Sequence, residues 1–211
     1  MRVCELFFSI QGETSRAGLP CTILRLSGCN LNCRYCDTVY ARKEGVEHSI
    51  EQILARVAEL RCPRVLVTGG EPLLQEQTPE LVTRLLDEGY ETMVETNGSL
   101  DIGVVDDRAF RIVDVKTPGS GESEHNRAEN MALLTERDEL KFVVCDEEDF
   151  NWSADYLARQ RLPEGMDVLF SPEHGTLPPA DLAAWILRDR LPVRLQVQLH
   201  KVLWGPDARG V

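Results

Sequence analysis

Apolar and polar positions alternate along this chain in two different periods. Short runs rich in β-branched residues, typical of buried strands, recur between longer segments in which apolar residues repeat with the period of an α-helix. The strand pattern predicts eight strands, at residues 3–8, 22–27, 64–68, 91–96, 110–116, 140–144, 167–171 and 194–200.

Helix start and stop signals lie between several of these strands. Ser49 and Gln52 have the spacing of a capping box at the start of an apolar stripe. Thr78 is expected to cap a second helix, with Pro79 in its first position and Gly89 closing it. Further helices are expected near residues 147–160 and 179–190.

Regular alternation of strands and helices predicts an α/β fold with a parallel sheet, either an open sheet or a complete or partial barrel. No linker or internal repeat divides the chain, so we expect one domain over residues 1–211. In such folds the chemistry gathers where the strands end. Polar and Gly-rich segments follow these strand ends here: SGCNLNCRYC, GGEP, TNGS, TPGSG and, at the last strand, His200.

Composition narrows the classes of function. The chain has 23 Lys and Arg against 35 Asp and Glu, a formal net charge of −12, which disfavours binding to nucleic acid or anionic membranes. No apolar run is long enough to span a bilayer, and no signal-peptide pattern is present at Met1. We therefore expect a soluble, cytoplasmic protein with neither a nucleic-acid nor a membrane partner.

Three of the seven cysteines, Cys29, Cys33 and Cys36, form a tight group after the second strand. Structural zinc sites use four ligands, and the only further candidates nearby are Cys21 and His48. Three thiolates on an iron–sulfur cubane would instead leave one iron open to a ligand, as catalysis requires. The remaining cysteines are expected in the core: Cys4, Cys21, Cys62 and Cys145.

The spacing of these cysteines, with Tyr35 before the last of them, resembles the radical S-adenosylmethionine (SAM) superfamily. The resemblance implies a partial, incomplete β/α barrel of reduced size, and a [4Fe-4S] cluster whose open iron is chelated by SAM. In that superfamily one electron from the cluster cleaves SAM to methionine and a 5′-deoxyadenosyl radical. The SAM-binding positions it implies are Tyr35, Asp37, Gly70, Glu71, Glu95, Asn97, Lys116 and Thr117.

These assignments have structural alternatives. GGEP also suits an ordinary strand-to-helix turn, and polar residues at strand ends are often simply solvated. Lys141 enters a strand, and we expect its side chain to be exposed.

Four further segments narrow the resemblance to the 7-carboxy-7-deazaguanine synthase family: ELFFSIQGET, LRLSGCNLNC, CDT and QLHK. The resemblance implies ring contraction of 6-carboxy-5,6,7,8-tetrahydropterin with loss of ammonia, on the route to 7-deazapurines such as queuosine. It also implies Mg²⁺ at Thr38, an electron donor such as flavodoxin or ferredoxin, and a homodimer. The substrate-binding residues it implies are Gln11, Gly12, Glu13, Arg25, Thr68 and His200.

The amide, carboxylate and guanidinium groups of this set complement a pterin with a carboxylate. Alternatively, Arg25 pairs with an internal carboxylate, Gln11 and Glu13 shape a turn, His200 is a core histidine, and Thr38 caps the next segment. His48, His125 and His174 are expected at the surface.

The chain departs from the family pattern in two places. The leader reads QGET where QGEG is commoner, and a short tail continues after Pro206, where some members end and use the terminal carboxylate to reach the substrate. Two other functions remain open at this stage: a radical SAM activase that abstracts hydrogen from a partner protein's glycine, and a metal-binding interaction module.

Overall fold

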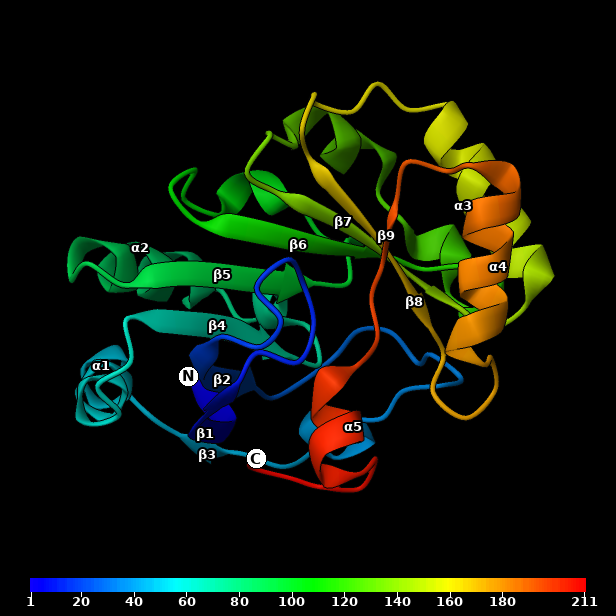
Figure 1. The fold of residues 1–211 in the computed structure, drawn as a ribbon. Coiled ribbons are helices and arrows are strands. Elements are labelled where there is room, and N and C mark those ends of the chain that lie inside the picture. The colour runs from blue at the N-terminus through cyan, green and yellow to red at the C-terminus, as the bar shows by residue number, and fades with distance from the viewer.

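The computed structural model describes all residues 1–211 and contains one nine-stranded sheet in the order β3-β1-β2-β4-β5-β6-β7-β8-β9 (Figure 1). Neighbouring strands are parallel from β2 to β9, while β1 is antiparallel to both β2 and β3. The two edges do not meet, so the expected partial barrel is confirmed. The strands are β1 (Arg2–Ile10), β2 (Pro20–Leu26), β3 (Val46–Glu47), β4 (Arg64–Gly69), β5 (Glu91–Thr96), β6 (Phe110–Val115), β7 (Glu139–Val144), β8 (Asp167–Pro172) and β9 (Arg194–Leu195).

The expectation of an all-parallel sheet is wrong at β1. Parallel neighbours need a long crossover, whereas only residues 11–19 connect β1 to β2. Backbone hydrogen bonds from Gln11 N to Leu19 O (2.8 Å) and from Gly18 N to Gln11 O (2.9 Å) fold this connection tightly. The first two strands therefore form an antiparallel hairpin, and its connection, residues 11–19, lies at the amino end of β2, where Ile10 pairs with Pro20.

The expected strand at residues 194–200 is also wrong. Only Arg194 and Leu195 pair with β8, and after one more hydrogen bond, from Gln196 N to Phe170 O (2.9 Å), the chain leaves the sheet. It then forms a short helix, α5 (Leu199–Trp204). β9 is an edge strand with no further neighbour, so alternation of apolar residues alone does not extend it.

The four longer helices match the expected positions: α1 (Ile50–Glu59), α2 (Thr78–Asp87), α3 (Glu147–Ala158) and α4 (Pro179–Asp189). The capping box of Ser49 and Gln52 is confirmed. Thr78 does not cap α2, because Gln77 precedes it as the N-cap and the Thr78 hydroxyl donates to Pro72 O (2.6 Å). Six short 3₁₀ helices complete the chain: η1 (Val39–Arg42), η2 (Pro72–Leu74), η3 (Ile102–Val104), η4 (Pro118–Ser120), η5 (Ser123–His125) and η6 (Ala128–Leu133).

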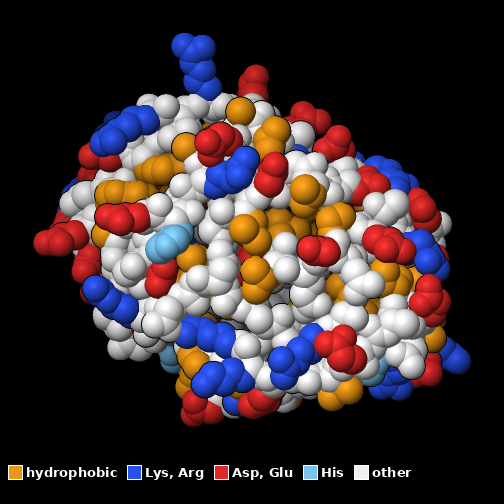
Figure 2. Space-filling model, turned by 180° about the vertical axis from the view of Figure 1, so that it is seen from behind, with side chains coloured by type: hydrophobic (Ala, Val, Ile, Leu, Met, Phe, Trp, Pro, Cys, Tyr) orange, Lys and Arg blue, Asp and Glu red, His pale blue; other side chains and the backbone are white.

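The helices cover the outer face of the sheet and bury its apolar side chains. One cluster packs α1 and α2 against β2, β4 and β5, and a second packs α3 and α4 against β6, β7 and β8. Seen from behind, acidic and basic side chains are interspersed around exposed hydrophobic ones (Figure 2). None of the helices is both long and apolar enough to cross a bilayer.

The inner face of the sheet changes character along the strands. Near the amino ends it is apolar, with Cys21, Leu66, Met93 and Ile112 in a small cluster. Because side chains alternate between faces with a period of two, Thr68, Glu95 and Asp114 lie on the same inner face, one layer closer to the carboxyl ends. Arg25 is paired with Thr68, and Lys141 with Asp114, in the register of the neighbouring strands. Those positions are polar and line a cavity: Arg25, Thr68, Glu95, Asp114 and Lys141.

Candidate active site

A cavity of about 480 Å³ lies at the carboxyl ends of the strands, where the fold class places chemistry. Of the residues named above as SAM, substrate or metal contacts, Glu71 and Thr117 lie outside its lining. The others line it: Gln11, Gly12, Glu13, Arg25, Cys29, Cys33, Tyr35, Cys36, Asp37, Thr38, Thr68, Gly70, Glu95, Asn97, Lys116 and His200.

The three grouped cysteines lie on the loop that follows β2, and each is half-buried at the cavity wall. This loop is attached to the segment after β6, because Arg34 N donates to Ser120 O (3.0 Å) and Asn32 N donates to a carboxylate oxygen of Glu122 (3.0 Å). Of the other cysteines, the core prediction is confirmed for Cys21 and Cys62 and wrong for Cys4 and Cys145, which are half-buried.

No group of three or more His, Cys, Asp or Glu side chains is placed closely enough to hold one metal ion. A cubane makes a different demand, because each thiolate bonds a different iron atom. Burial raises the pKa of the thiols of Cys29 and Cys33, so both are protonated near neutral pH until a metal displaces the proton. Three half-buried thiols on one loop that opens on the cavity fit a cluster with one free iron.

The GGEP segment packs directly against the cysteine loop. A Cβ added to Gly70 would overlap Gly28 O and lie 2.6 Å from the Cβ of Cys29, so only glycine fits here. The backbone also joins the two loops, because Glu71 N donates to Gly28 O (2.8 Å). Gly70 thus keeps the wall next to the first cysteine free of side chains, as close approach of a ligand requires.

Glu71 is fully buried and forms an internal clasp. Its carboxylate accepts hydrogen bonds from the backbone of Leu73 (2.9 Å) and Asn97 (2.7 Å) and from the hydroxyl of Thr96 (2.9 Å). Thr117 is likewise occupied, since its hydroxyl donates to Val143 O (2.9 Å) and lies 3.0 Å from Asp149 Oδ2. These two residues support the loops around the cavity. The polar atoms of both side chains are used in internal hydrogen bonds, and neither side chain lines the cavity.

Asp114 on β6 and Lys116 just after it form a buried ion pair, with 2.8 Å between Lys116 Nζ and Asp114 Oδ2. Asp114 Oδ1 and the hydroxyl of Tyr35 are buried, line the same cavity and have no hydrogen-bond partner. Buried polar atoms are almost always satisfied in folded proteins. This wall of the cavity therefore presents free polar groups to a polar ligand.

The expectation that Lys141 is exposed is wrong. Its side chain is only 5% exposed, pairs with Glu13, and lies with its Nζ 2.8 Å from Glu95 Oε1. The alternation in LKFVV places Leu140 and Phe142 in the apolar outer layer, so Lys141 faces the cavity between them. Asp114 is its partner in the register of β6 and β7.

The segment of Gln11, Gly12 and Glu13 is hydrogen-bonded to the start of α5. Leu199 N donates to Gly12 O (2.8 Å), and Gln198 Nε2 donates to Glu13 Oε1 (3.0 Å). Glu13 N also donates to Gln11 Oε1 (3.2 Å), which is the turn considered above as an alternative. Residues 11–13 therefore form a turn and also line the cavity.

Burial opposes the charge on Glu13, but Lys141 and the hydrogen bond from Gln198 outweigh it and lower its pKa to about 2. Burial lowers the pKa of His200, whose ring packs on Gly12. At neutral pH this wall therefore offers an ionised carboxylate next to a neutral imidazole.

Arg25 pairs with an internal carboxylate and also lines the cavity. Its Nε lies 3.0 Å from Glu5 Oε1, and the hydroxyl of Tyr40 donates to the same oxygen (2.6 Å). Glu5 holds the guanidinium in place through Nε alone, and leaves the two terminal nitrogens of Arg25 for another partner. The chain's tail continues this wall, because the guanidinium of Arg209 stacks 3.6 Å from the centre of the Tyr40 ring.

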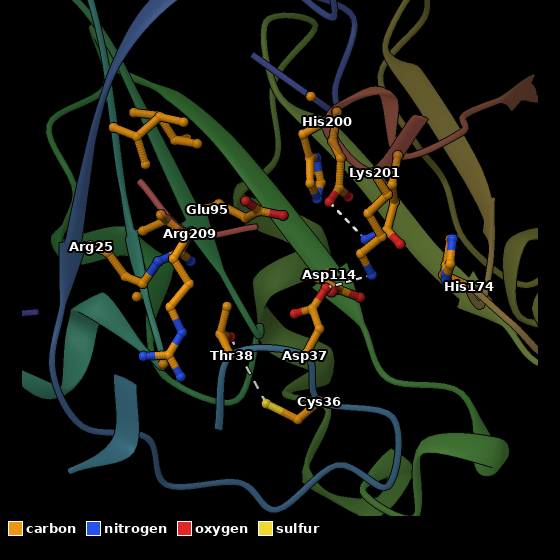
Figure 3. Close-up of a pocket in the computed structure, with 18 of the residues that line it drawn as sticks. Arg25, Cys36, Asp37, Thr38, Glu95, Asp114, His174, His200, Lys201 and Arg209 are labelled. Carbon is orange, nitrogen blue, oxygen red and sulfur yellow. Dashed lines mark hydrogen bonds and ion pairs between the residues drawn. The ribbon is translucent and has the colours of Figure 1, made fainter. Parts of the chain in front are cut away.

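Thr38 is the N-cap residue of η1, but its side chain makes no capping hydrogen bond. Figure 3 shows Thr38 between Cys36 and Arg209, and its hydroxyl lies 3.9 Å from the sulfur of Cys36. Asp37 next to it pairs with Lys201 of α5 (2.7 Å). The hydroxyl of Thr38 thus has only the long contact with the Cys36 sulfur, which leaves its oxygen able to bind a ligand.

The histidine predictions have mixed outcomes. His125 and His174 are exposed as expected, while His48 is half-buried. His174 nevertheless lines the mouth of the cavity. Sequence reasoning did not name several lining residues, although Glu5, Gln198 and Lys201 stand in the segments ELFFSIQGET and QLHK: Glu5, Tyr40, Asp114, Gln198, Lys201 and Arg209. Strand alternation would have found Glu5 and Asp114, since each shares the inward face with a residue that was identified.

Comparison with known proteins identifies the family of this chain. The family model of the Radical SAM superfamily matches residues 23–116. A protein from Chlorobaculum tepidum called 7-carboxy-7-deazaguanine synthase is 48% identical over 100% of this chain and 97% of its own length. One of the same name from Koribacter versatilis is 41% identical over the full length of both. The crystal structure of QueE from Escherichia coli superposes with a TM-score of 0.78 over 94% of each chain, at 23% identity.

Proposed function

Because this chain belongs to the 7-carboxy-7-deazaguanine synthase family of the radical SAM type, we propose that it contracts the ring of 6-carboxy-5,6,7,8-tetrahydropterin to 7-carboxy-7-deazaguanine with loss of ammonia. The protein is a radical SAM enzyme of 7-deazapurine biosynthesis. One observation carries the proposal: a single cavity has the three cysteines on one wall and Gln11, Glu13 and Arg25 on another.

The family implies a [4Fe-4S] cluster and SAM, and the residues present fit both. Cys29, Cys33 and Cys36 would hold the cluster, and the unpartnered oxygens of Asp114 and Tyr35 lie where a polar cofactor would bind. When bound, the cluster and SAM together supply the radical that starts the reaction. Gly70 and Asn97 lie beside Cys29, so we assign them to the SAM wall, with Glu95 on β5 and Lys116 just after β6.

The opposite wall complements a carboxylated pterin. Glu13, held ionised, accepts hydrogen bonds from the amine and amide edge of the ring, and the amide of Gln11 can both donate and accept there. The free terminal nitrogens of Arg25 suit a carboxylate in a two-pronged contact. His200 and Thr68 complete the wall, so each polar group of the substrate has a partner of matching chemistry.

Gly12 makes room for His200, which gives a first test. A Cβ at residue 12 would overlap the imidazole ring, so Gly12→Ala displaces His200 from its present position. We expect the dissociation constant for the pterin to rise roughly 10-fold, as for loss of one good polar contact. The dissociation constant for SAM should stay unchanged, because Gly12 lies on the pterin wall. Isothermal titration of each ligand without reductant measures both values, and an equal change in the two would contradict the assignment.

We further propose that Thr38 binds Mg²⁺, which prefers hard oxygen ligands and keeps much of its water shell. Its hydroxyl is not used in capping, so it is free for a cation. Thr38→Ala should raise the Mg²⁺ concentration needed for half-maximal turnover several-fold, while Thr38→Ser, which keeps the oxygen, should not. The same Mg²⁺ dependence in the alanine variant as in the unsubstituted enzyme would rule out this ligand.

Three proposals rest on the family resemblance alone. They are a reductant such as flavodoxin or ferredoxin, a homodimeric state and a cytoplasmic location. The single sheet supports treating residues 1–211 as one catalytic unit, with the tail after Pro206 forming part of the cavity wall.

The deciding experiment is anaerobic reconstitution with iron and sulfide, followed by SAM, reductant, Mg²⁺ and 6-carboxytetrahydropterin. We expect the absorbance of the deazapurine product to appear, and SAM cleavage to depend strongly on the pterin. An activase would instead cleave SAM without regard to the pterin. A metal-binding interaction module would bind zinc tightly and leave SAM unbound.

A further inference from the structure

Lys141 lies between two carboxylates that come from distant parts of the chain. Its ammonium group pairs with Glu13 Oε2 and lies 2.8 Å from Glu95 Oε1. Glu13 follows β1 and Glu95 lies on β5, so the lysine on β7 bridges segments that are otherwise separated by the cavity. No other donor reaches Glu13 Oε2, and this oxygen depends on Lys141 alone.

The cluster of charges around Lys141 is almost closed to water. The exposed fractions of the side chains are 5% for Lys141, 14% for Glu13 and 20% for Glu95. Without the ammonium group, two carboxylates would face each other in a poorly solvated space, where like charges repel strongly. Removing one partner of a buried ion pair is costly because the remaining charge has no partner.

The two carboxylates belong to different ligand walls, an assignment that rests on the proposed function. Glu13 lies on the pterin wall and Glu95 on the SAM wall. We propose that Lys141 is a positioning residue that holds Glu13 and Glu95 together as oriented carboxylates, and so sets the binding of both the pterin and SAM. It acts through its two carboxylate partners.

Lys141→Met tests this inference because methionine is similar in length and has no charge. In the reconstituted enzyme without reductant, we expect the dissociation constants for the pterin and for SAM each to rise roughly 10-fold or more. Gln198→Leu is the matched control, since Gln198 contacts Glu13 and not Glu95. Gln198→Leu should weaken the binding of the pterin only. Normal affinity of Lys141→Met for both ligands would overturn the inference. Weaker binding of the pterin with unchanged binding of SAM would also overturn it.

The pH dependence distinguishes positioning from general damage. In the unsubstituted protein the pKa of Glu13 is about 2, so Glu13 stays ionised between pH 6 and 8. The other charged groups around this cluster are Glu95, Asp114, Lys116 and His200. Without Lys141, burial and the neighbouring carboxylates raise the pKa of Glu13, and the ionised form that binds the pterin is lost as the pH falls. The ratio of pterin dissociation constants, variant to unsubstituted, should therefore increase from pH 8 to pH 6.

Two further variants complete the test. In Lys141→Met with Glu13→Gln, residue 13 cannot titrate, so the pH dependence of that ratio should vanish. Lys141→Arg keeps the positive charge and should retain more of both affinities than Lys141→Met, which also covers the case in which the methionine variant fails to fold. A constant ratio in Lys141→Met, or an equal loss in Lys141→Arg, contradicts the inference. If the unsubstituted enzyme binds SAM but no pterin, the proposed function itself fails and this inference fails with it.

Discussion

Cys33→Ala is expected to abolish reductive cleavage of SAM while the protein stays folded. Cys33 is half-buried on the loop after β2 and belongs to none of the apolar clusters. Its loss removes one of the three thiolates needed for the cluster, while the backbone hydrogen bond from Arg34 to Ser120 does not involve its side chain. Iron content, SAM cleavage and far-UV circular dichroism together measure the result.

Cys145→Ala is the matched control for this prediction. Cys145 is also half-buried, but it lies outside the lining of the cavity. We expect this variant to keep both its iron and its activity. Turnover that survives in Cys33→Ala would mean that another set of ligands holds the cluster.

Arg25→Ala should weaken pterin binding by about 1 to 3 kcal/mol, or roughly 5- to 150-fold, with little effect on SAM. The structure explains why alanine is a severe change. Arg25 neutralises Glu5, so its removal leaves a carboxylate whose only remaining partner here is the hydroxyl of Tyr40. That charge would face the carboxylate of the substrate.

A double variant separates these two effects. Arg25→Ala with Glu5→Gln removes the unpaired charge and should recover part of the lost pterin affinity, and the part that stays lost measures the direct contact. Dissociation constants for both ligands in the two variants give the comparison. Equal weakening of SAM and pterin would show that Arg25 supports the fold of the cavity and does not bind substrate.

Local signals in the sequence predicted much of this fold. Alternating apolar positions located seven strands, and the capping box at Ser49 located the start of α1, because both patterns act within a few residues. The failures have long-range causes. RLQVQLH alternates like a strand, but only Arg194 and Leu195 have a partner strand beside them. The direction of β1 depends on the length of its connection to β2, which alternation does not encode.

In the candidate site, too, residues within short motifs could be predicted from the sequence, and residues placed by distant contacts could not. Cys29, Cys33, Cys36 and Gly70 stand in short motifs and could be found by spacing. Lys141 has no motif, and its burial follows from two carboxylates that lie 128 and 46 residues away in the sequence. General statistics for lysine predict exposure, and only the register of neighbouring strands shows that this one faces inward.

Besides Arg25 and Thr68, the pterin wall contains segments from the two ends of the chain, which hold each other through Leu199 and Gly12 and through Gln198 and Glu13. Both segments lie outside the strands, and both lie outside residues 23–116, the part that matches the superfamily model. The ends can therefore diverge without altering the strand that carries the cysteine loop. In evolutionary terms, the proposed recognition of the substrate is divided between these ends and two positions of the core, Arg25 and Thr68, and only the second part lies within the superfamily model.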